Sequence, residues 1–142
     1  MIQIVYCSDA TTEFSPQQLV ALLERSRVNN QARGITGMLL YRGGRFLQVL
    51  EGEAANVHPL VDRIGRDPRH HRVVLSSETE IDVRDFADWS MGFADLSSRP
   101  PDALPGFTHF LESSLSASSF AKHLPQAKRL LLAFKDQVAR AA

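Results

Sequence analysis

Two short, mostly apolar stretches, residues 35–42 and 45–51, are separated by just two residues, Gly43-Gly44. A two-residue Gly-Gly link is typical of a β-hairpin, because a type I′ turn needs positive φ at both of its central positions. The two stretches are therefore predicted to be neighbouring strands.

A strand and a helix are predicted before the hairpin. Residues 2–7 are apolar on both faces, as in a central strand. Ser15-Pro16-Gln17-Gln18 is typical of a helix start, with a capping serine, a first-turn proline and a capping-box partner. Asn29-Asn30 is predicted to end this helix, since Asn tolerates the left-handed conformation of a C-terminal cap.

A second helix and two more strands are predicted after the hairpin. Apolar residues recur at helical spacing in residues 57–64, and Pro59 is compatible with a helix if it lies in the first turn, so we expect a start near residue 56. Asp67-Pro68 closes this helix. Residues 73–81 are predicted as the fourth strand, and 88–96 as a segment that contains the fifth.

The order β-α-β-β-α-β-β predicts an α/β (α+β) fold with a ferredoxin-like βαββαβ core plus a fifth strand, and two helices on one sheet face. We expect residues 1–96 to form this domain. Residues 97–105 contain three prolines and are predicted as a linker, followed by helices at 116–123 and 125–142. An apolar stripe on the last helix predicts that this tail, residues 97–142, covers the other sheet face.

Composition argues against several classes of protein. Lys plus Arg and Asp plus Glu both number 16, so no net charge attracts nucleic acid or an anionic membrane. The single cysteine, Cys7, excludes an internal disulfide. No apolar run approaches the roughly 20 residues that span a bilayer, and the N-terminus is not typical of a signal peptide. The cytoplasm is the predicted compartment.

Two polar residues stand where the strand pattern favours apolar ones. Gln48 shares a face with Phe46 and Leu50 in a strand predicted to be central, and Tyr6 has a similar place in the first strand. A buried amide without a partner costs about 1–3 kcal/mol. We expect the first and third strands to be parallel neighbours that bring Tyr6 and Gln48 within hydrogen-bonding reach. The alternative to a functional pair is that the two side chains merely satisfy each other.

Other polar or bulky residues have simple structural explanations when each is taken alone. Arg69-His70-His71-Arg72 could suggest a metal or phosphate site, but adjacent histidines do not share a helix face and no carboxylate spacing accompanies them. Trp89 and Met91 fit the core side of an amphipathic strand. These patterns alone therefore leave the function open.

Six fragments taken together resemble the successive signatures of the BLUF (blue light using flavin) family, in order and at similar spacing. They cover residues 1–95, about two thirds of the chain. The fragments are Tyr6-Cys7-Ser8, Arg27-Val28-Asn29-Asn30, Ile35-Thr36-Gly37-Met38-Leu39-Leu40-Tyr41, Phe46-Leu47-Gln48-Val49-Leu50-Glu51-Gly52, Asp67-Pro68-Arg69-His70 and Phe86-Ala87-Asp88-Trp89-Ser90-Met91.

The resemblance implies a flavin ring bound between the two helices. Asn30 would pair with the C4 carbonyl and N3 edge of the ring, and Gln48 would lie between Tyr6 and the N5/C4 edge. Some family members have His in place of Asn29, which is left out of the predicted set for that reason. The implied cofactor-binding residues are Tyr6, Ser8, Arg27 (a phosphate contact), Asn30, Ile35 and Leu39 (apolar ring contacts), Gln48, and Asp67, Arg69 and His70 (the pyrimidine and ribityl side).

The resemblance also implies a photoreceptor and not an enzyme. The expected cofactor is FAD, with FMN or riboflavin as alternatives, held non-covalently. Light would drive an electron and a proton from Tyr6, and the hydrogen bonds of Gln48 would then rearrange by rotation or tautomerism to give a red-shifted state. Trp89 and Met91 would relay the change. A homo-oligomer and a separate effector protein are the expected partners.

Two other classes of function remain as alternatives. The first is an enzyme on the same topology, either a flavin-dependent oxidoreductase or an acylphosphatase-like hydrolase, although the chain has no obvious insertion to form a substrate pocket. The second is a sensor of a small molecule or of RNA that binds no flavin. Zero net charge and the lack of basic-aromatic strand motifs argue against RNA.

Overall fold

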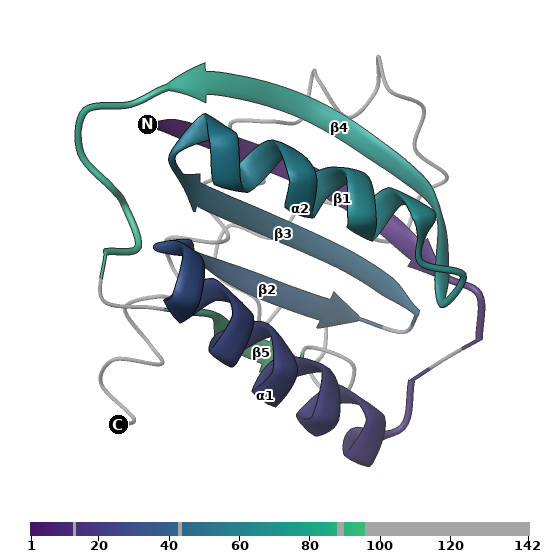
Figure 1. Ribbon diagram of the computed structural model, residues 1–142. Coiled ribbons are helices and arrows are strands. Elements are labelled where there is room, and N and C mark those ends of the chain that lie inside the picture. The colour runs from purple at the N-terminus through teal and green to yellow at the C-terminus, as the bar shows by residue number, and fades with distance from the viewer. Residues whose placement is uncertain (13, 43, 88–89, 96–142) are drawn as a thin grey trace, which may run out of the picture.

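The computed structural model describes residues 1–12, 14–42, 44–87 and 90–95. It shows one β-sheet with both helices packed on the same face (Figure 1). The predicted linker, the two predicted tail helices and Trp89 lie outside the described residues. The elements are β1 (Ile2–Ala10), α1 (Pro16–Arg33), β2 (Thr36–Arg42), β3 (Arg45–Gly52), α2 (Ala54–Arg66), β4 (His70–Glu80) and β5 (Gly92–Asp95).

The strands lie in the order β4-β1-β3-β2-β5, which is the ferredoxin-like arrangement with β5 added at the β2 edge. β5 runs parallel to β2, and every other neighbouring pair is antiparallel. The expectation that β1 and β3 are parallel is wrong. The α1 crossover makes β2 run in the same direction as β1, and the tight β2–β3 hairpin then reverses β3. The two strands are neighbours nonetheless, with Tyr6 directly opposite Gln48.

Helix α1 begins as predicted but ends later. The Ser15 side chain accepts from the Gln18 backbone amide, and Oε1 of Gln18 accepts from the Ser15 backbone amide, which confirms the capping box. The helix continues past Asn30 to Arg33 and ends at Gly34, whose φ is 64°. Because Gly takes this left-handed conformation at no steric cost, it makes the better terminator, and the Asn30 side chain is free for another role.

Helix α2 also differs from its predicted start. It begins at Ala54, two residues before the predicted start, so Pro59 lies beyond the first turn. The proline removes the hydrogen bond to the carbonyl of Ala55, a residue that is exposed and can bind water instead. The helix ends at Arg66 with Asp67 as its cap, as predicted. β4 then starts three residues earlier than the predicted 73.

The core lies between the sheet and the two helices. Side chains that alternate along β1, β2 and β3 face the helices, because successive strand residues point to opposite faces. The helix-facing core includes Ile2, Ile4, Tyr6, Leu19, Leu23, Leu39, Leu50, Val57 and Met91.

Strands β2 and β3 approach each other closely at Gly37, where a Cβ atom would lie 2.0 Å from the carbonyl oxygen of Val49, so a glycine is needed there. In the described part of the chain, no helix is long and apolar enough to span a membrane.

Candidate functional site

A cavity of about 310 Å³ opens between α1, α2 and the sheet. Its volume is at the lower end of the range of small-molecule sites, roughly 300–1,000 Å³. Apolar side chains form much of the wall and polar groups gather along its edge, as expected for a flat organic ligand with a polar rim. The lining residues are Tyr6, Phe14, Leu22, Arg25, Ser26, Asn29, Asn30, Leu39, Phe46, Gln48, Leu50, Leu60, Arg63, Ile64, Asp67, Arg69 and His70.

The floor of the cavity carries the predicted pair of polar residues. The Tyr6 hydroxyl donates a hydrogen bond to Oε1 of Gln48, and both side chains are buried. Nε2 of Gln48 lies 3.3 Å from Sδ of Met91, to which it donates. Burial raises the pKa of the Tyr6 phenol above its ordinary value, and the nearby Asp67 carboxylate raises it further. The phenol is therefore neutral, and its proton points at the side-chain amide of Gln48, whose nitrogen contacts Met91.

The α1 wall holds the segment that leads into β5. Nδ2 of Asn30, a buried residue that lines the cavity, donates to the carbonyl of Ser90 at 2.8 Å. Nε of Arg27 donates to the carbonyl of Met91 at 3.0 Å. Arg27, expected to contact a phosphate, is not among the lining residues. These two α1 side chains fix residues 90 and 91 beside the cavity.

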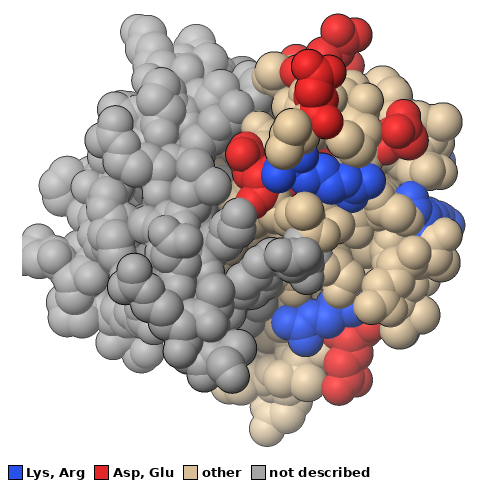
Figure 2. All heavy atoms as spheres, turned by 90° about the vertical axis from the view of Figure 1, so that its left-hand side faces the viewer, with Lys and Arg blue, Asp and Glu red and all other residues tan. Residues whose placement is uncertain are grey.

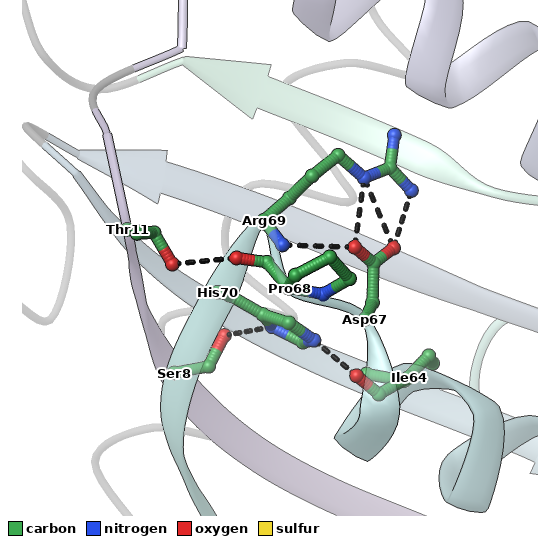
Figure 3. Close-up of polar contacts among 7 residues, drawn as sticks. All are labelled: Ser8, Thr11, Ile64, Asp67, Pro68, Arg69 and His70. Carbon is green, nitrogen blue, oxygen red and sulfur yellow. Dashed lines mark hydrogen bonds and ion pairs between the residues drawn. The ribbon is translucent and has the colours of Figure 1, made fainter.

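The corner between α2 and β4 supplies charged groups to the far edge of the cavity (Figure 3). Asp67 and Arg69 form an ion pair with a contact of 2.5 Å. The hydrogen bond from Arg69 lowers the pKa of the Asp67 carboxyl, so that this group is ionised. The corner is tied to β1 by the Thr11 hydroxyl, which donates to the carbonyl of Pro68 at 2.7 Å.

His70 links this corner to the buried part of β1 (Figure 3). Its Nε2 contacts the carbonyl of Ile64, which can only accept, so Nε2 carries a proton. Its Nδ1 lies 2.9 Å from the Ser8 hydroxyl. Ser8 does not line the cavity, and its contact with the site runs through His70. Adjacent His71 takes no part, and no group of three potential metal ligands occurs among the described residues.

Seven of the ten predicted cofactor-binding residues come together around this one cavity. Ile35 is buried in the core behind the lining, and with Ser8 and Arg27 it makes three residues that do not line it. The predicted set lacked Arg25 on α1 and Arg63 on α2, two arginines that face the cavity from opposite helices. Each adjoins inward-facing apolar positions in the helical repeat, which is the signal that could have found them. The seven are Tyr6, Asn30, Leu39, Gln48, Asp67, Arg69 and His70.

Comparison with known proteins decides the family. Residues 1–92 match the family described as BLUF, sensors of blue-light using FAD. The chain belongs to the BLUF family. Residues 1–92 therefore form a blue-light-sensing domain whose cofactor is a flavin. The cavity fits such a cofactor, because it combines apolar walls with amide, carboxylate and guanidinium groups that match the polar edge and phosphates of a flavin nucleotide.

The BLUF relatives differ greatly in length. Photoactivated adenylate cyclase subunit beta of Euglena gracilis is 30% identical over 97% of this chain, which spans 16% of that subunit. The dark-state structure of BlrB, a BLUF protein, is 29% identical with a TM-score of 0.73, and the match covers 93% of this chain and 95% of BlrB. Klebsiella pneumoniae BlrP1 with FMN and cyclic diGMP is 36% identical with a TM-score of 0.63, over 67% of this chain and 26% of BlrP1.

Proposed function

We propose that this BLUF domain senses blue light through the hydrogen bond between Tyr6 and Gln48. The observation that supports this most strongly is the place of the pair, buried in the floor of the cavity and opposite each other on β1 and β3. A structural pair could lie anywhere in the core. This pair lies where a bound flavin would contact it.

The flavin would be held by the residues predicted from the family resemblance, with two changes of emphasis. Asn30 would pair with the ring edge, and its bond to Ser90 would couple the ring to the segment before β5. Arg25 and Arg63 are better placed than Arg27 for a phosphate, because they line the cavity and form no ion pair with another described residue. The full proposed set is Tyr6, Ser8, Arg27, Asn30, Ile35, Leu39, Gln48, Asp67, Arg69 and His70, with Arg25 and Arg63 added.

The chemistry that an excited flavin supplies is a strong oxidising power toward a neighbouring phenol. Tyr6 is the phenol that would give up an electron to the flavin and its hydroxyl proton toward Oε1 of Gln48, the atom to which the hydroxyl donates. Because an amide carries both a donor and an acceptor, Gln48 can exchange them by rotation or tautomerism. Once the electron and the proton had returned to Tyr6, Gln48 would keep its new hydrogen bonds.

Met91 is the proposed exit for the signal. Nε2 of Gln48 now donates to its sulfur, and rotation of the amide would turn Oε1 toward that sulfur instead. Sulfur accepts weakly and a thioether cannot donate, so the contact would be lost. Trp89, which lies outside the described residues, is proposed to share this relay. The relay acts on β5, which begins at the next residue, Gly92.

The proposed output is a light-dependent change in association, either with a second copy of the chain or with a separate effector protein, and no reaction on a substrate. We divide the chain into the domain of residues 1–96 and a tail of residues 97–142 that carries this output. A cyclic-nucleotide enzyme is the favoured class of effector, because a photoactivated adenylate cyclase is among the relatives.

The test is an illumination experiment with two variants. Tyr6→Phe removes the hydroxyl and Gln48→Leu removes the amide, and each is expected to keep flavin but lose the reversible red shift. Tyr41→Phe is the matched control, because Tyr41 does not line the cavity, and it should keep the shift. Normal photocycling in either variant, with flavin loading confirmed, would overturn the role of that residue. Light scattering in dark and light tests the change in association.

A further inference from the structure

A second buried polar group of β3, the carboxyl of Glu51, has no part in the flavin site. Glu51 is 0% exposed. Gln48 comes three residues before Glu51 in β3, and because strand residues alternate between faces, the two side chains lie on opposite faces of the sheet. Burying a carboxyl group carries a large desolvation cost unless the group is hydrogen-bonded. Its partners therefore show what this position is built to hold.

Two partners of the Glu51 carboxyl come from the loop between β4 and β5, and the others are the side chains of Gln3 on β1 and Thr36 on β2. Oε2 accepts from the backbone amide of Asp85 at 2.8 Å, and Oε1 accepts from the backbone amide of Phe86 at 2.8 Å. Nε2 of Gln3 donates to Oε2 at 2.9 Å and also to Oδ2 of Asp85 at 2.9 Å. One side chain of the central sheet thus holds two successive amides of a loop more than 30 residues further along the chain.

Arg84 holds the same loop from its outer side. Its guanidinium donates to the carbonyl of Gly34 at 2.7 Å and to the hydroxyl of Thr36 at 2.9 Å, which ties the loop to the end of α1 and the start of β2. It also donates to the carbonyl of Glu51 at 3.2 Å. Seen from this end of the sheet, acidic and basic side chains of the described residues lie beside one another (Figure 2). Arg84 thus holds the loop through hydrogen bonds to the end of α1, the start of β2 and the end of β3.

The later end of the loop meets the light-sensing pair. Met91, five residues after Phe86, contacts Gln48 through its sulfur, and its carbonyl accepts from Arg27. β3 therefore contacts this loop twice. Its Glu51 holds the middle of the loop, at Asp85 and Phe86, on one sheet face, and its Gln48 touches Met91, at the end of the loop, on the other.

We propose that Glu51 is a positioning residue that anchors the β4–β5 loop, so that a change at Gln48 moves residues 90–95. A displacement at one end of a segment becomes a movement relative to the sheet if the other end is fixed. Without the anchor, the whole loop shifts and the change at Met91 is dissipated. This inference rests on the proposed function. It gives a role in the light response to Glu51, which is 0% exposed and lies on the sheet face opposite to Gln48.

The test compares Glu51→Gln with Glu53→Gln, a change of the same chemistry at an exposed position two residues later. Flavin absorption and hydrogen exchange of residues 84–87 and 90–95 are measured in dark and light. In Glu51→Gln the red shift should keep its size, and exchange at Asp85 and Phe86 should rise about 10-fold in the dark, since the NH2 group of a glutamine cannot accept from a backbone amide as the carboxyl oxygen does. The light-minus-dark difference at 90–95 should fall to less than half. Glu53→Gln should match the wild type.

The outcomes separate this inference from the proposed function. A wild type without a red shift contradicts the proposed function itself. A wild type that shifts but shows no light-dependent exchange at 90–95, or a Glu51→Gln variant that keeps the full difference, overturns the role of Glu51 alone. A purely structural role would raise exchange equally in both states and leave the difference intact. If Glu51→Gln fails to hold flavin, Glu51→Asp decides, because it keeps the carboxyl group but draws it back by one methylene from the amides of Asp85 and Phe86. A full difference in that variant, with exchange at Asp85 and Phe86 raised, overturns the anchor.

Discussion

Replacing one partner of the Tyr6–Gln48 hydrogen bond should cost more stability than replacing both. Tyr6 is 4% exposed and Gln48 is 6% exposed, so neither group can turn to water when its partner is removed. Tyr6→Phe leaves Oε1 of Gln48 without its donor, and Gln48→Leu leaves a buried hydroxyl without an acceptor. Each single variant should therefore lose about 1–3 kcal/mol of unfolding free energy.

The double variant Tyr6→Phe/Gln48→Leu removes the donor and the acceptor together. Because no unpaired group is left, its loss should be smaller than the sum of the single losses by at least about 1 kcal/mol, which is within the usual range for residues in contact. Sulfur is a weak acceptor, so the lost contact with Met91 should add little.

The assay is urea unfolding in the dark, followed by circular dichroism, at one saturating flavin concentration for all variants. Fixing the free flavin matters, because a ligand that binds the folded state raises its apparent stability. Tyr41→Phe is the control, since its hydroxyl accepts from the backbone amide of Phe14 and is independent of Gln48. Combined with Gln48→Leu, this control should give additive losses. Additive losses for Tyr6→Phe and Gln48→Leu would refute the buried bond.

Three further predictions concern the phenol, the cavity wall and the sheet. In Tyr41→Phe, Tyr6 is the remaining tyrosine, and because burial raises its pKa it should not ionise near pH 10, the ordinary value. The stability of this variant should fall above about pH 10, where the unfolded chain loses a proton that the folded chain keeps. An ultraviolet titration with a midpoint near pH 10 would contradict this. Asn30→Ala should weaken flavin binding about 10-fold by fluorescence titration, the effect of one lost hydrogen bond of about 1.4 kcal/mol, and unchanged affinity would contradict its place in the site. Gly37→Ala should lower stability by at least about 2 kcal/mol in thermal melts, whereas Gly65→Ala, with open space around its Cβ position, should not, and equal melting would refute the close approach.

Much of the fold could be predicted from the sequence, because its local signals agree with one another. The Gly43-Gly44 link marked the hairpin, and the cap at Ser15 marked the start of α1. The errors occurred where tertiary context outweighed a local signal. Asn is a common residue at helix ends, but the buried side chain of Asn30 donates to the carbonyl of Ser90, and the helix ends at Gly34 instead. The prediction that β1 and β3 are parallel was wrong, because the direction of β3 follows from how the α1 crossover and the β2–β3 hairpin combine.

The site was less predictable than the fold. Tyr6 and Gln48 stood out as polar residues in apolar strands, and the structure joins them. Arg27 has the right chemistry for a phosphate contact, but its side chain faces Met91. Neighbouring positions of a helix point in different directions, so a shift of one position decides whether a side chain reaches the cavity. Glu51 was quoted in a family fragment without a role. Its burial and its bonds to the loop depend on residues far away in sequence, which no local pattern reveals.

The central claim is that a buried tyrosine and glutamine respond to light next to a bound flavin. The most direct measurement is the absorption spectrum of the purified, flavin-loaded protein before blue light, after it, and again after darkness. The account predicts a yellow protein whose oxidised-flavin spectrum shifts slightly to the red and returns in the dark, with the shift lost in Gln48→Leu. A bleached spectrum, from a stable reduced flavin or a cysteinyl adduct, or no change at all, would contradict it.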